Sequence, residues 1–455
     1  MPDNSSCYGP LLIAFFADLE RAGVEYCILR DYEGLPDRVG NDIDFLVQPE
    51  DVPSFRDCLM RAAVSNGWEL LKNPQRYRFR SYWLFSESAG KILHIDVWDR
   101  HQWRGLTWVD NAAFFSSRHK YNNMFYVADR ETEIGSFLIK DLVQNGAVRE
   151  KYYTLIHAGV RDHAAAVQRF LERSVGSRLA ARLISNARQA DWAALNSSAG
   201  DIRRAVLWQN VKRHPLGTVV NLAAFLWGHV GALLNQKNGM IIVLVGPDGS
   251  GKSTVSRGLQ TSLAELFPAC RYYHGQFGIL LELKTLKKLF RKKGSVASPA
   301  LGDDALPSPH AEQMKPYSFV RAMTYVAYYA LDFMLGYRIV ARFQSLGNMI
   351  IFDRYFYDYL IQPPYKRVPR GLLLAIAKLL PRPDLILYLQ CSPDAIHQRK
   401  PELTPGEIDR QQKTIQQALT ALPNCRTVDT TCNPGQAVVQ VGEMVRSIMK
   451  KRFKI

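Results

Sequence analysis

The sequence lacks most features that would place it outside ordinary cytoplasmic proteins. Its seven cysteines in 455 residues are scattered, odd in number and never spaced C-x-x-C. We therefore expect reduced thiols, with neither a disulfide framework nor a zinc site. The first residues, "MPDNSSCYGP", have no basic start, and the apolar residues after them are soon interrupted by charge. No signal peptide is predicted, and the sequence contains no internal repeat.

A long hydrophobic run is also missing. The most apolar segment, "GTVVNLAAFLWGHVGALL" at 217–234, is interrupted by Asn221 and His229. Its length is at the short limit of a membrane-spanning helix, which needs roughly 20 residues. We predict a connector helix that is buried or lies at a membrane interface, in preference to one that spans a bilayer.

Acidic side chains are fewer than basic ones. The sequence has 42 Asp and Glu against 58 Lys and Arg, which gives a formal net charge of +16. Such an excess favours anionic partners, including nucleotides, phosphorylated glycans, nucleic acids and anionic membrane surfaces. Charge alone does not select among them, and no motif specific for nucleic acid accompanies it.

What is present divides the chain into three predicted regions. Residues 1–130 contain "EYCILRD", "DIDFLVQ" and "KILHIDVW", in which β-branched and aromatic residues alternate with others as in strands, so an α+β domain is predicted. Residues 131–237 are mainly helical and are predicted to connect the domains. Residues 238–455 begin with a strand, a Gly-rich turn and an amphipathic helix, which predicts an α/β domain with a three-layer parallel sheet. Within it, the segment at 290–316 is rich in Pro, Gly and Ser and is predicted to be an exposed insertion.

The Gly-rich turn carries the clearest chemical signal. In "MIIVLVGPDGSGKST", Gly246, Gly251, Lys252 and Ser253 satisfy the pattern G-x-x-x-x-G-K-[ST]. Glycines let backbone N–H groups surround a polyphosphate, the lysine reaches its β- and γ-phosphates, and the serine hydroxyl meets Mg²⁺. ATP and Mg²⁺ are the predicted ligands. The remaining candidate residues of the loop are Asp248, Gly249, Ser250 and Thr254.

Three segments together resemble the thymidylate kinase family of P-loop kinases, over roughly residues 240–455. They are "GPDGSGKST", "NMIIFDRYFYD" and "RPDLILYLQCSPDAIHQRKPELTPGEIDRQQ", in that order. The resemblance implies that Asp353 holds Mg²⁺ through water or accepts a proton from the attacking hydroxyl, and that Arg354 clamps the acceptor. It also implies a lid that neutralises the transferred phosphoryl group, with Arg399, Lys400 and Arg410 as its candidates.

The acceptor half departs from that family. The stretch "FYDYLIQPPYKR" follows the DRY motif, where thymidylate kinases build the pocket for the base. We therefore expect an acceptor other than dTMP. Asp332 lies within an apolar helical segment, and it either pairs with a neighbour such as Arg338 or points into the acceptor pocket.

A second set of carboxylates lies near the N-terminus. In "NDIDFLV", Asp42 and Asp44 are two residues apart on a predicted strand and so share one face, while "LHIDVW" supplies Asp96. Three such carboxylates can bind the metal pair of nucleotidyl transfer. Residues 10–125 resemble the nucleotidyltransferase superfamily of the DNA polymerase β type. Its Gly-Ser pair is absent here, and Arg30 is the candidate replacement as a phosphate contact.

Three functions are compatible with these patterns. The first is an ATP-dependent kinase fused to a nucleotidyltransferase-like domain. Its kinase part resembles those found with bacterial surface-glycan synthesis, which implies a sugar, glycan or lipid-linked acceptor and peripheral association with a membrane. The second is a nucleoside-monophosphate kinase with a degenerate N-terminal domain. The third is a binding module that senses ATP without turnover.

Overall fold

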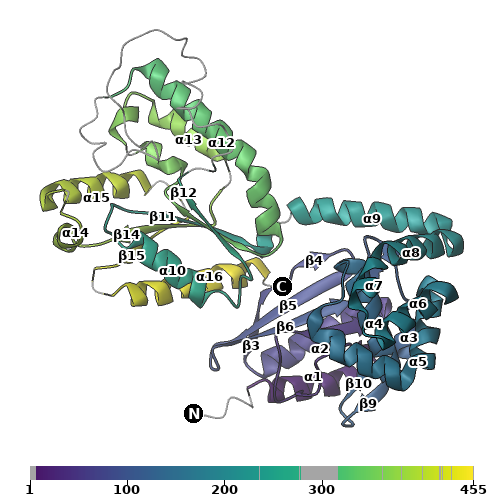
Figure 1. Cartoon of the computed structure of the whole chain (residues 1–455). Helices are drawn as coiled ribbons and strands as arrows, with labels where there is room; N and C mark the ends of the chain where they lie inside the picture. Colours follow the sequence, from purple (N-terminus) through teal and green to yellow (C-terminus); the bar gives the residue numbers. More distant parts are fainter. Residues whose placement is uncertain are drawn as a thin grey trace, which may run out of the picture. The chain divides into compact units, whose positions relative to one another are not determined.

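The computed structural model describes residues 7–234, 236–275, 277, 316–360, 362–380, 382–401, 403–419, 422, 424–431 and 433–453. Of the predicted insertion at 290–316, residues 290–315 lie outside these ranges. The chain forms two compact units, Met1–Ala232 together with Arg452–Ile455, and Leu233–Lys451. Figure 1 shows the elements of each unit.

The N-terminal unit is built on a mixed eight-stranded sheet. Its order is β3-β5-β6-β2-β1-β10-β9, with β4 paired to β5, and a separate ribbon joins β7 to β8. The strands are β1 (Tyr26–Ile28), β2 (Ile43–Val47), β3 (Trp68–Lys72), β4 (Gln75–Arg76), β5 (Phe79–Ser86), β6 (Lys91–Trp98), β7 (Gln102–Trp103), β8 (Leu106–Thr107), β9 (His119–Tyr121) and β10 (Phe125–Val127). β2 and β6 run parallel.

Helices cover both faces of this sheet. They are α1 (Gly9–Arg21), α2 (Val52–Ser65), α3 (Ala112–Phe115), α4 (Arg130–Gln144), α5 (Tyr153–Val175), α6 (Ser177–Arg188), α7 (Trp192–Ser197) and α8 (Ala199–Arg213), with 3-10 turns η1 (Pro49–Asp51) and η2 (Glu150–Tyr152). Alternation along β2 separates two cores, because Phe45 and Val47 pack with α1 and α2. Leu46, on the other face, joins the core of α4 to α8.

The region 131–237, predicted as a helical connector, contains helices α4 to α8. Helices α4 to α8 share a core with the N-terminal sheet and belong to its unit. The apolar segment at 217–234 forms α9 (Pro215–Leu234). Among the helices that the structure describes, none combines the length and hydropathy needed to cross a bilayer.

The C-terminal unit has a five-stranded sheet in which every pairing is parallel, in the order β12-β13-β11-β14-β15. Its strands are β11 (Met240–Val245), β12 (Cys270–His274), β13 (Met349–Asp353), β14 (Leu385–Gln390) and β15 (Cys425–Asp429). All residues of β11 are buried, as expected for a central strand covered on both faces. This arrangement confirms the predicted α/β architecture with a parallel sheet.

Helices cover both faces of the parallel sheet. They are α10 (Lys252–Ser262), α12 (Phe319–Ser345), α13 (Arg370–Leu379), α14 (Pro393–Arg399), α15 (Pro405–Leu419) and α16 (Pro434–Phe453), with 3-10 turns η3 (Gln236–Asn238), η5 (Phe356–Leu360) and η6 (Pro363–Tyr365). One core joins α12, α13 and α15 to the sheet. On α10, Gly258 lies against Val438 of α16. The buried carboxylate of Asp332 in α12 accepts a hydrogen bond from the Phe277 N–H, 2.9 Å away.

Candidate functional sites

The Gly-rich turn connects β11 to α10 and has the backbone shape of a phosphate-binding loop. Gly249 and Gly251 have φ values of 86° and 88°, a left-handed conformation that favours glycine. A Cβ at Gly246 would lie 2.6 Å from the Ser250 Oγ, so a side chain does not fit there. Helix α10 begins at Lys252, and its free N–H groups therefore face the loop.

Lys252 folds back onto this loop. Its Nζ lies 2.9 Å from the Gly246 carbonyl oxygen and 3.0 Å from that of Pro247, and the side chain is buried. Ser253 and Thr254 are exposed at the start of the helix. The ammonium group is thus positioned at the loop, where a polyphosphate can replace the carbonyl groups as its partner.

Asp248 gathers three positive side chains around the loop. Its carboxylate lies 2.9 Å from Arg354, 3.4 Å from Lys252 and 3.6 Å from Lys400. Burial raises the pKa of Asp248, but these three cations outweigh it and the pKa is lowered overall. One loop residue therefore brings together cations from the three segments that carry the family resemblance.

Asp353 and Arg354 lie at the end of β13, beside the strand that leads into the loop. Asp353 pairs with Leu244 in the parallel register, and its Oδ2 accepts a hydrogen bond from the Tyr272 hydroxyl at 2.7 Å. Its Oδ1 is buried and has no hydrogen-bond partner among the residues that the structure describes. Such an oxygen, with the exposed hydroxyl of Ser253, fits the ligand set of a hydrated Mg²⁺.

Arg354 has an unusual backbone. Its φ is 72°, in the left-handed region that few residues other than glycine adopt. Its N–H donates to the Leu244 carbonyl oxygen at 3.2 Å, and its guanidinium reaches Asp248. The strained turn directs the arginine toward the phosphate loop, and such strain often marks a functional residue.

Two of the three lid candidates lie against the loop. The guanidinium of Arg399 donates to the carbonyl oxygens of Gly249 and Thr431, at 3.3 and 3.1 Å. Lys400 contacts Asp248, as described above. Arg410 is exposed on α15, and its role at the loop stays a prediction.

Asp358 was assigned no chemical role from the sequence. It is buried in η5, and burial raises its pKa to about 6; Arg354 and Lys252 oppose that rise, whereas Asp353 and Asp248 add to it. A carboxyl group with this pKa can exchange a proton near neutral pH. A carboxylate within an otherwise aromatic stretch is one signal in the sequence, but that pattern does not indicate a position near the loop.

Next to Asp358 in the chain, Tyr359 lines an open pocket of about 330 Å³. The other residues with ring or basic side chains in its lining are Tyr365, Lys366, Pro369, Arg367 and Arg370. The lining thus combines aromatic surface with positive charge, which suits a ligand that has both a ring and an anionic group.

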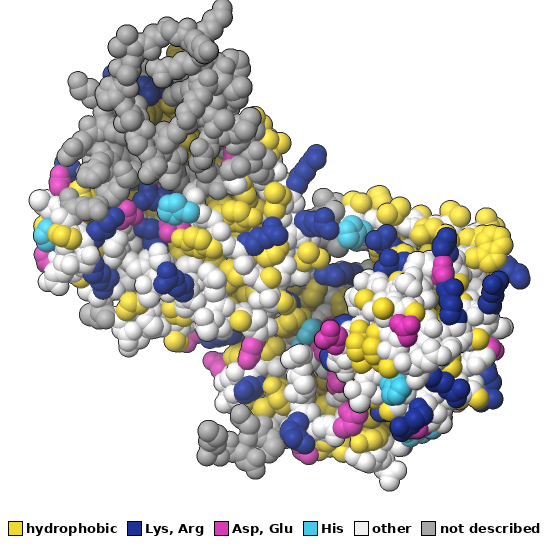
Figure 2. All heavy atoms as spheres, in the orientation of Figure 1, with side chains coloured by type: hydrophobic (Ala, Val, Ile, Leu, Met, Phe, Trp, Pro, Cys, Tyr) yellow, Lys and Arg dark blue, Asp and Glu magenta, His cyan; other side chains and the backbone are white. Residues whose placement is uncertain are grey.

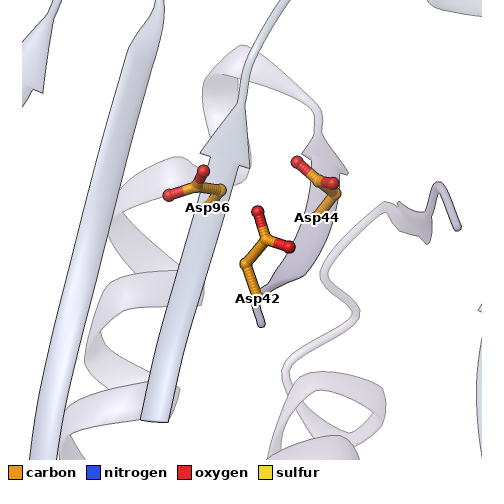
Figure 3. Close-up of side chains that lie close together, drawn as sticks. All are labelled: Asp42, Asp44 and Asp96. Atoms are coloured by element: carbon orange, nitrogen blue, oxygen red, sulfur yellow. The ribbon is translucent and has the colours of Figure 1, made fainter. Parts of the chain in front are cut away.

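In the N-terminal unit the three predicted carboxylates come together. One oxygen from each of Asp42, Asp44 and Asp96 lies within 4.8 Å of the others. Asp44 and Asp96 are opposite each other on the parallel strands β2 and β6, and Figure 3 shows the Asp42 carboxylate between them. The Nε2 of His94 lies 2.8 Å from the Oδ1 of Asp96. Three convergent carboxylates have the chemistry to hold divalent cations.

Arg30 lies directly on this carboxylate cluster. Its Nε donates to the Asp44 carboxylate. Its Nη2 lies 3.4 Å from the Asp42 carboxylate, and its Nη1 donates to the Tyr152 hydroxyl at 3.1 Å. The arginine was predicted as a phosphate contact. In this structure it lies against the carboxylates of Asp42 and Asp44, and a role toward phosphate stays a prediction.

Lys140 of α4 also acts on the cluster and was missed in the sequence. Burial raises the pKa of Asp44, but Lys140 and Arg30 outweigh it, so the pKa is lowered. Burial and the neighbouring Asp44 raise the pKa of Asp42, as expected for close carboxylates. A signal existed, because Lys140 belongs to the largely apolar run "IGSFLIKDLV". Only the packing of α4 on the sheet shows where its charge lies.

Among known proteins, similarity to this chain is found with solved structures. No protein-family model and no curated protein matches the chain. Among solved structures, thymidylate kinase from Ehrlichia chaffeensis is similar at 14% identity and a TM-score of 0.30, over 46% of this chain and 98% of that one. Thymidylate kinase from Candida albicans is similar at 19% identity and a TM-score of 0.31, over 47% and 93%. TM-scores this low do not indicate a function, so the residues of the two sites are the basis for the function proposed below.

Proposed function

We propose that the C-terminal unit transfers the γ-phosphoryl group of Mg²⁺-ATP to a hydroxyl group of an acceptor other than dTMP. The observation that carries this proposal is the convergence at Asp248 of Lys252, Arg354 and Lys400 beside a glycine-shaped loop. Phosphoryl transfer depends mainly on positioning and on positive charge around the transferred group. A set of cations at one loop supplies both.

Each residue of the site has a separate role in the proposed reaction. Lys252 moves from the loop carbonyls to the β- and γ-phosphates, and Arg354 holds the acceptor in a bidentate fork. Ser253 and Asp353 would hold Mg²⁺, which neutralises phosphate charge when it is bound. As the acceptor oxygen bonds to phosphorus, the bond to the β-phosphate oxygen breaks and ADP leaves. The hydroxyl proton passes to a carboxylate, for which Asp353 and Asp358 are the candidates.

For the acceptor, we propose a sugar-containing molecule with an anionic group, as a glycan or a lipid-linked precursor. The pocket beside Tyr359 supports this class, because Lys366, Arg367 and Arg370 supply positive charge next to two tyrosine rings. Aromatic faces and basic groups suit sugars and phosphates respectively. A nucleoside monophosphate is the competing acceptor, since it too has a ring and a phosphate.

An acceptor screen tests the kinase proposal. The full chain is incubated with labelled ATP and Mg²⁺ together with dTMP, other nucleoside monophosphates, phosphorylated sugars or lipid-linked glycans, and Lys252→Ala serves as the blank. Label on a sugar-containing acceptor supports the proposal. Label on a nucleotide makes the protein a nucleoside-monophosphate kinase. ATP binding with no product from any acceptor would reduce the unit to a binding module.

A second activity is favoured by the carboxylates of the N-terminal unit. Because one oxygen from each of Asp42, Asp44 and Asp96 lies within 4.8 Å, we propose that they hold the divalent cations of a nucleotidyl transfer. Arg30 would then move from the carboxylates to the triphosphate. Release of pyrophosphate from a nucleoside triphosphate, lost in Asp44→Asn but kept in Lys252→Ala, is the expected result. Pyrophosphate formation that persists in Asp44→Asn contradicts it.

A further inference from the structure

Helix α9 has the reverse of the usual polarity, since its polar and small residues face the protein. Asn221 accepts a hydrogen bond from the Tyr77 hydroxyl at 3.0 Å, and Thr218 is buried. Gly228 lies so close to Tyr77 that an added Cβ would be 3.1 Å from the tyrosine Cβ. A Cβ at Gly105 would lie 2.6 Å from the Asn221 carbonyl oxygen, so the two backbones are in close contact.

The opposite side of α9 is apolar and exposed. Its large exposed residues are Leu216, Val219, Val220, Leu226, Trp227 and Val230, with Trp227 79% exposed. Their spacing of three and four residues places them along one side of the helix. Figure 2 shows the hydrophobic side chains gathered along α9. Scattered exposed apolar residues are ordinary, but a continuous stripe of them marks an interaction surface.

The stripe continues onto the preceding helix and has basic residues at the junction. On α8, Leu207, Trp208 and Val211 are exposed hydrophobic residues, and Lys212 and Arg213 are exposed at its end. We call the exposed side chains between Leu207 and Val230 the apolar-basic surface.

Negative charge is absent from this part of the sequence. Between Asp201 and Asp248 the chain contains no Asp or Glu, and its basic residues there are Arg203, Arg204, Lys212, Arg213 and Lys237. Apolar side chains next to basic ones, without acidic neighbours, are complementary to the interface of a bilayer with anionic headgroups.

We propose that the apolar-basic surface binds a membrane containing anionic phospholipids, with α9 lying in the plane of the headgroups. An apolar face of this kind is buried to a depth of roughly 5–10 Å, while lysine and arginine stay at the headgroups. A second copy of the chain is a poorer occupant. A two-fold contact brings the same patch against itself, so Lys212 and Arg213 would meet a surface with no acidic residue. This inference does not depend on the proposed enzymatic activities.

The test uses the full chain and vesicles of two compositions, phosphatidylcholine alone and phosphatidylcholine with 30% phosphatidylglycerol, in a sedimentation assay. Binding is expected to the anionic vesicles and to weaken as salt is raised. Trp227→Glu is expected to reduce binding at least about tenfold. It replaces a large apolar side chain that would enter the bilayer by a negative charge, which anionic headgroups repel. Lys212→Gln is expected to reduce binding about fivefold.

The matched control is Val64→Glu, which places the same charge at a residue of α2 that is 78% exposed and outside the surface. It should bind vesicles like the wild type. An equal loss in Val64→Glu, or no binding by the wild-type chain, overturns the proposal. The protein is also sedimented without lipid. A concentration-dependent dimer that Trp227→Glu abolishes would overturn the proposal too, because a second copy of the chain would then occupy the surface.

Discussion

The two units each bring carboxylates and cations together, but from different kinds of element. In the N-terminal unit, Asp44 and Asp96 lie on adjacent parallel strands, and the register of the sheet fixes their distance. In the C-terminal unit, Asp248 comes from a glycine loop, Asp353 from a strand end and Asp358 from a 3-10 turn. The first site is therefore positioned mainly by strand pairing, whereas the second depends on how three separate segments pack together.

The balance of charge also differs. In the N-terminal cluster, three carboxylates face the side chains of Arg30 and Lys140, which leaves an excess of negative charge suited to divalent cations. At the phosphate loop, the carboxylates of Asp248, Asp353 and Asp358 are outnumbered by cations, which is an excess of positive charge suited to a polyphosphate. The cations are Lys252, Arg354, Lys400 and Arg399. Similar residue types thus give sites for ligands of opposite charge, and four substitutions test that difference.

The largest effect is expected at Lys252. Lys252→Ala removes the ammonium group that meets the β- and γ-phosphates, and phosphoryl transfer should fall about a thousandfold. The turnover of ATP is measured with the acceptor found in the screen. Lys413→Ala removes an exposed lysine of α15 and should keep full activity. Unchanged turnover in Lys252→Ala would remove the kinase proposal.

At the N-terminal cluster, Asp44→Asn should weaken metal binding by more than about a hundredfold. Loss of a residue that only supports a metal ligand lowers metal affinity by about 10- to 100-fold, and loss of a direct ligand should lower it at least as much. The measurement is calorimetric titration of the full chain with Mn²⁺. Asp57→Asn changes an exposed carboxylate of α2 and serves as the control. If the wild type and Asp44→Asn bind the same number of Mn²⁺ ions with equal affinity, the cluster is not a metal site.

Asp358→Asn is expected to stabilise the C-terminal unit at neutral pH. Burial raises the Asp358 pKa from an ordinary value of 3.8 to about 6 in the folded protein. The ionised carboxylate is therefore less stable in the folded state than in the unfolded state. The wild type therefore loses stability as pH rises through about 6, whereas the amide does not titrate. The shift corresponds to roughly 3 kcal/mol at pH 7.5.

The melting transition that ATP raises reports on this unit. Asp358→Asn should melt several degrees above the wild type at pH 7.5, and the gap should close toward pH 4. A gap that is equal at both pH values would mean that ionisation of Asp358 is not its cause. Transfer activity measured in parallel shows whether this carboxylate also takes the acceptor proton.

The smallest effect is expected for Arg354→Lys. The charge is kept but the bidentate fork is lost, so the KM for the acceptor should rise about tenfold while ATP affinity stays nearly unchanged. Steady-state kinetics with each substrate varied in turn separates the two constants. A fall in ATP affinity with an unchanged acceptor KM would show that Arg354 serves the donor.

Local patterns allowed much of this to be predicted from the sequence. The alternation in "DIDFLVQ" and "KILHIDVW" located β2 and β6. The spacing of Asp42 and Asp44 predicted that both reach one site, and they do, although Asp42 lies just before β2. The glycines and Lys252 located the loop between β11 and α10. In each case the signal is contained within about ten residues, so no knowledge of distant contacts was needed.

Features that depend on distant contacts were not predicted. The packing of α4 against the sheet brings Lys140 to Asp44, and Tyr152 reaches Arg30 from a separate turn. Asp332 was expected either to pair with a neighbour such as Arg338 or to point into the acceptor pocket. Its carboxylate accepts the N–H of Phe277, which no pattern in the sequence connects to it. A backbone like that of Arg354 cannot be inferred either, because non-glycine residues seldom adopt it.

The order of strands in the C-terminal sheet also constrains how the protein is synthesised. β11 is central, and its two neighbours are β13 (Met349–Asp353) and β14 (Leu385–Gln390), both much later in the chain. The loop after β11 is held from still farther away, because the Thr430 hydroxyl donates to the Ser250 carbonyl oxygen at 2.8 Å. On the ribosome, the phosphate loop therefore leaves the exit tunnel long before its partners exist. During that interval the apolar strand "MIIVLV" has no partner strand in its own sheet, so its hydrophobic side chains stay unburied until β13 and β14 emerge.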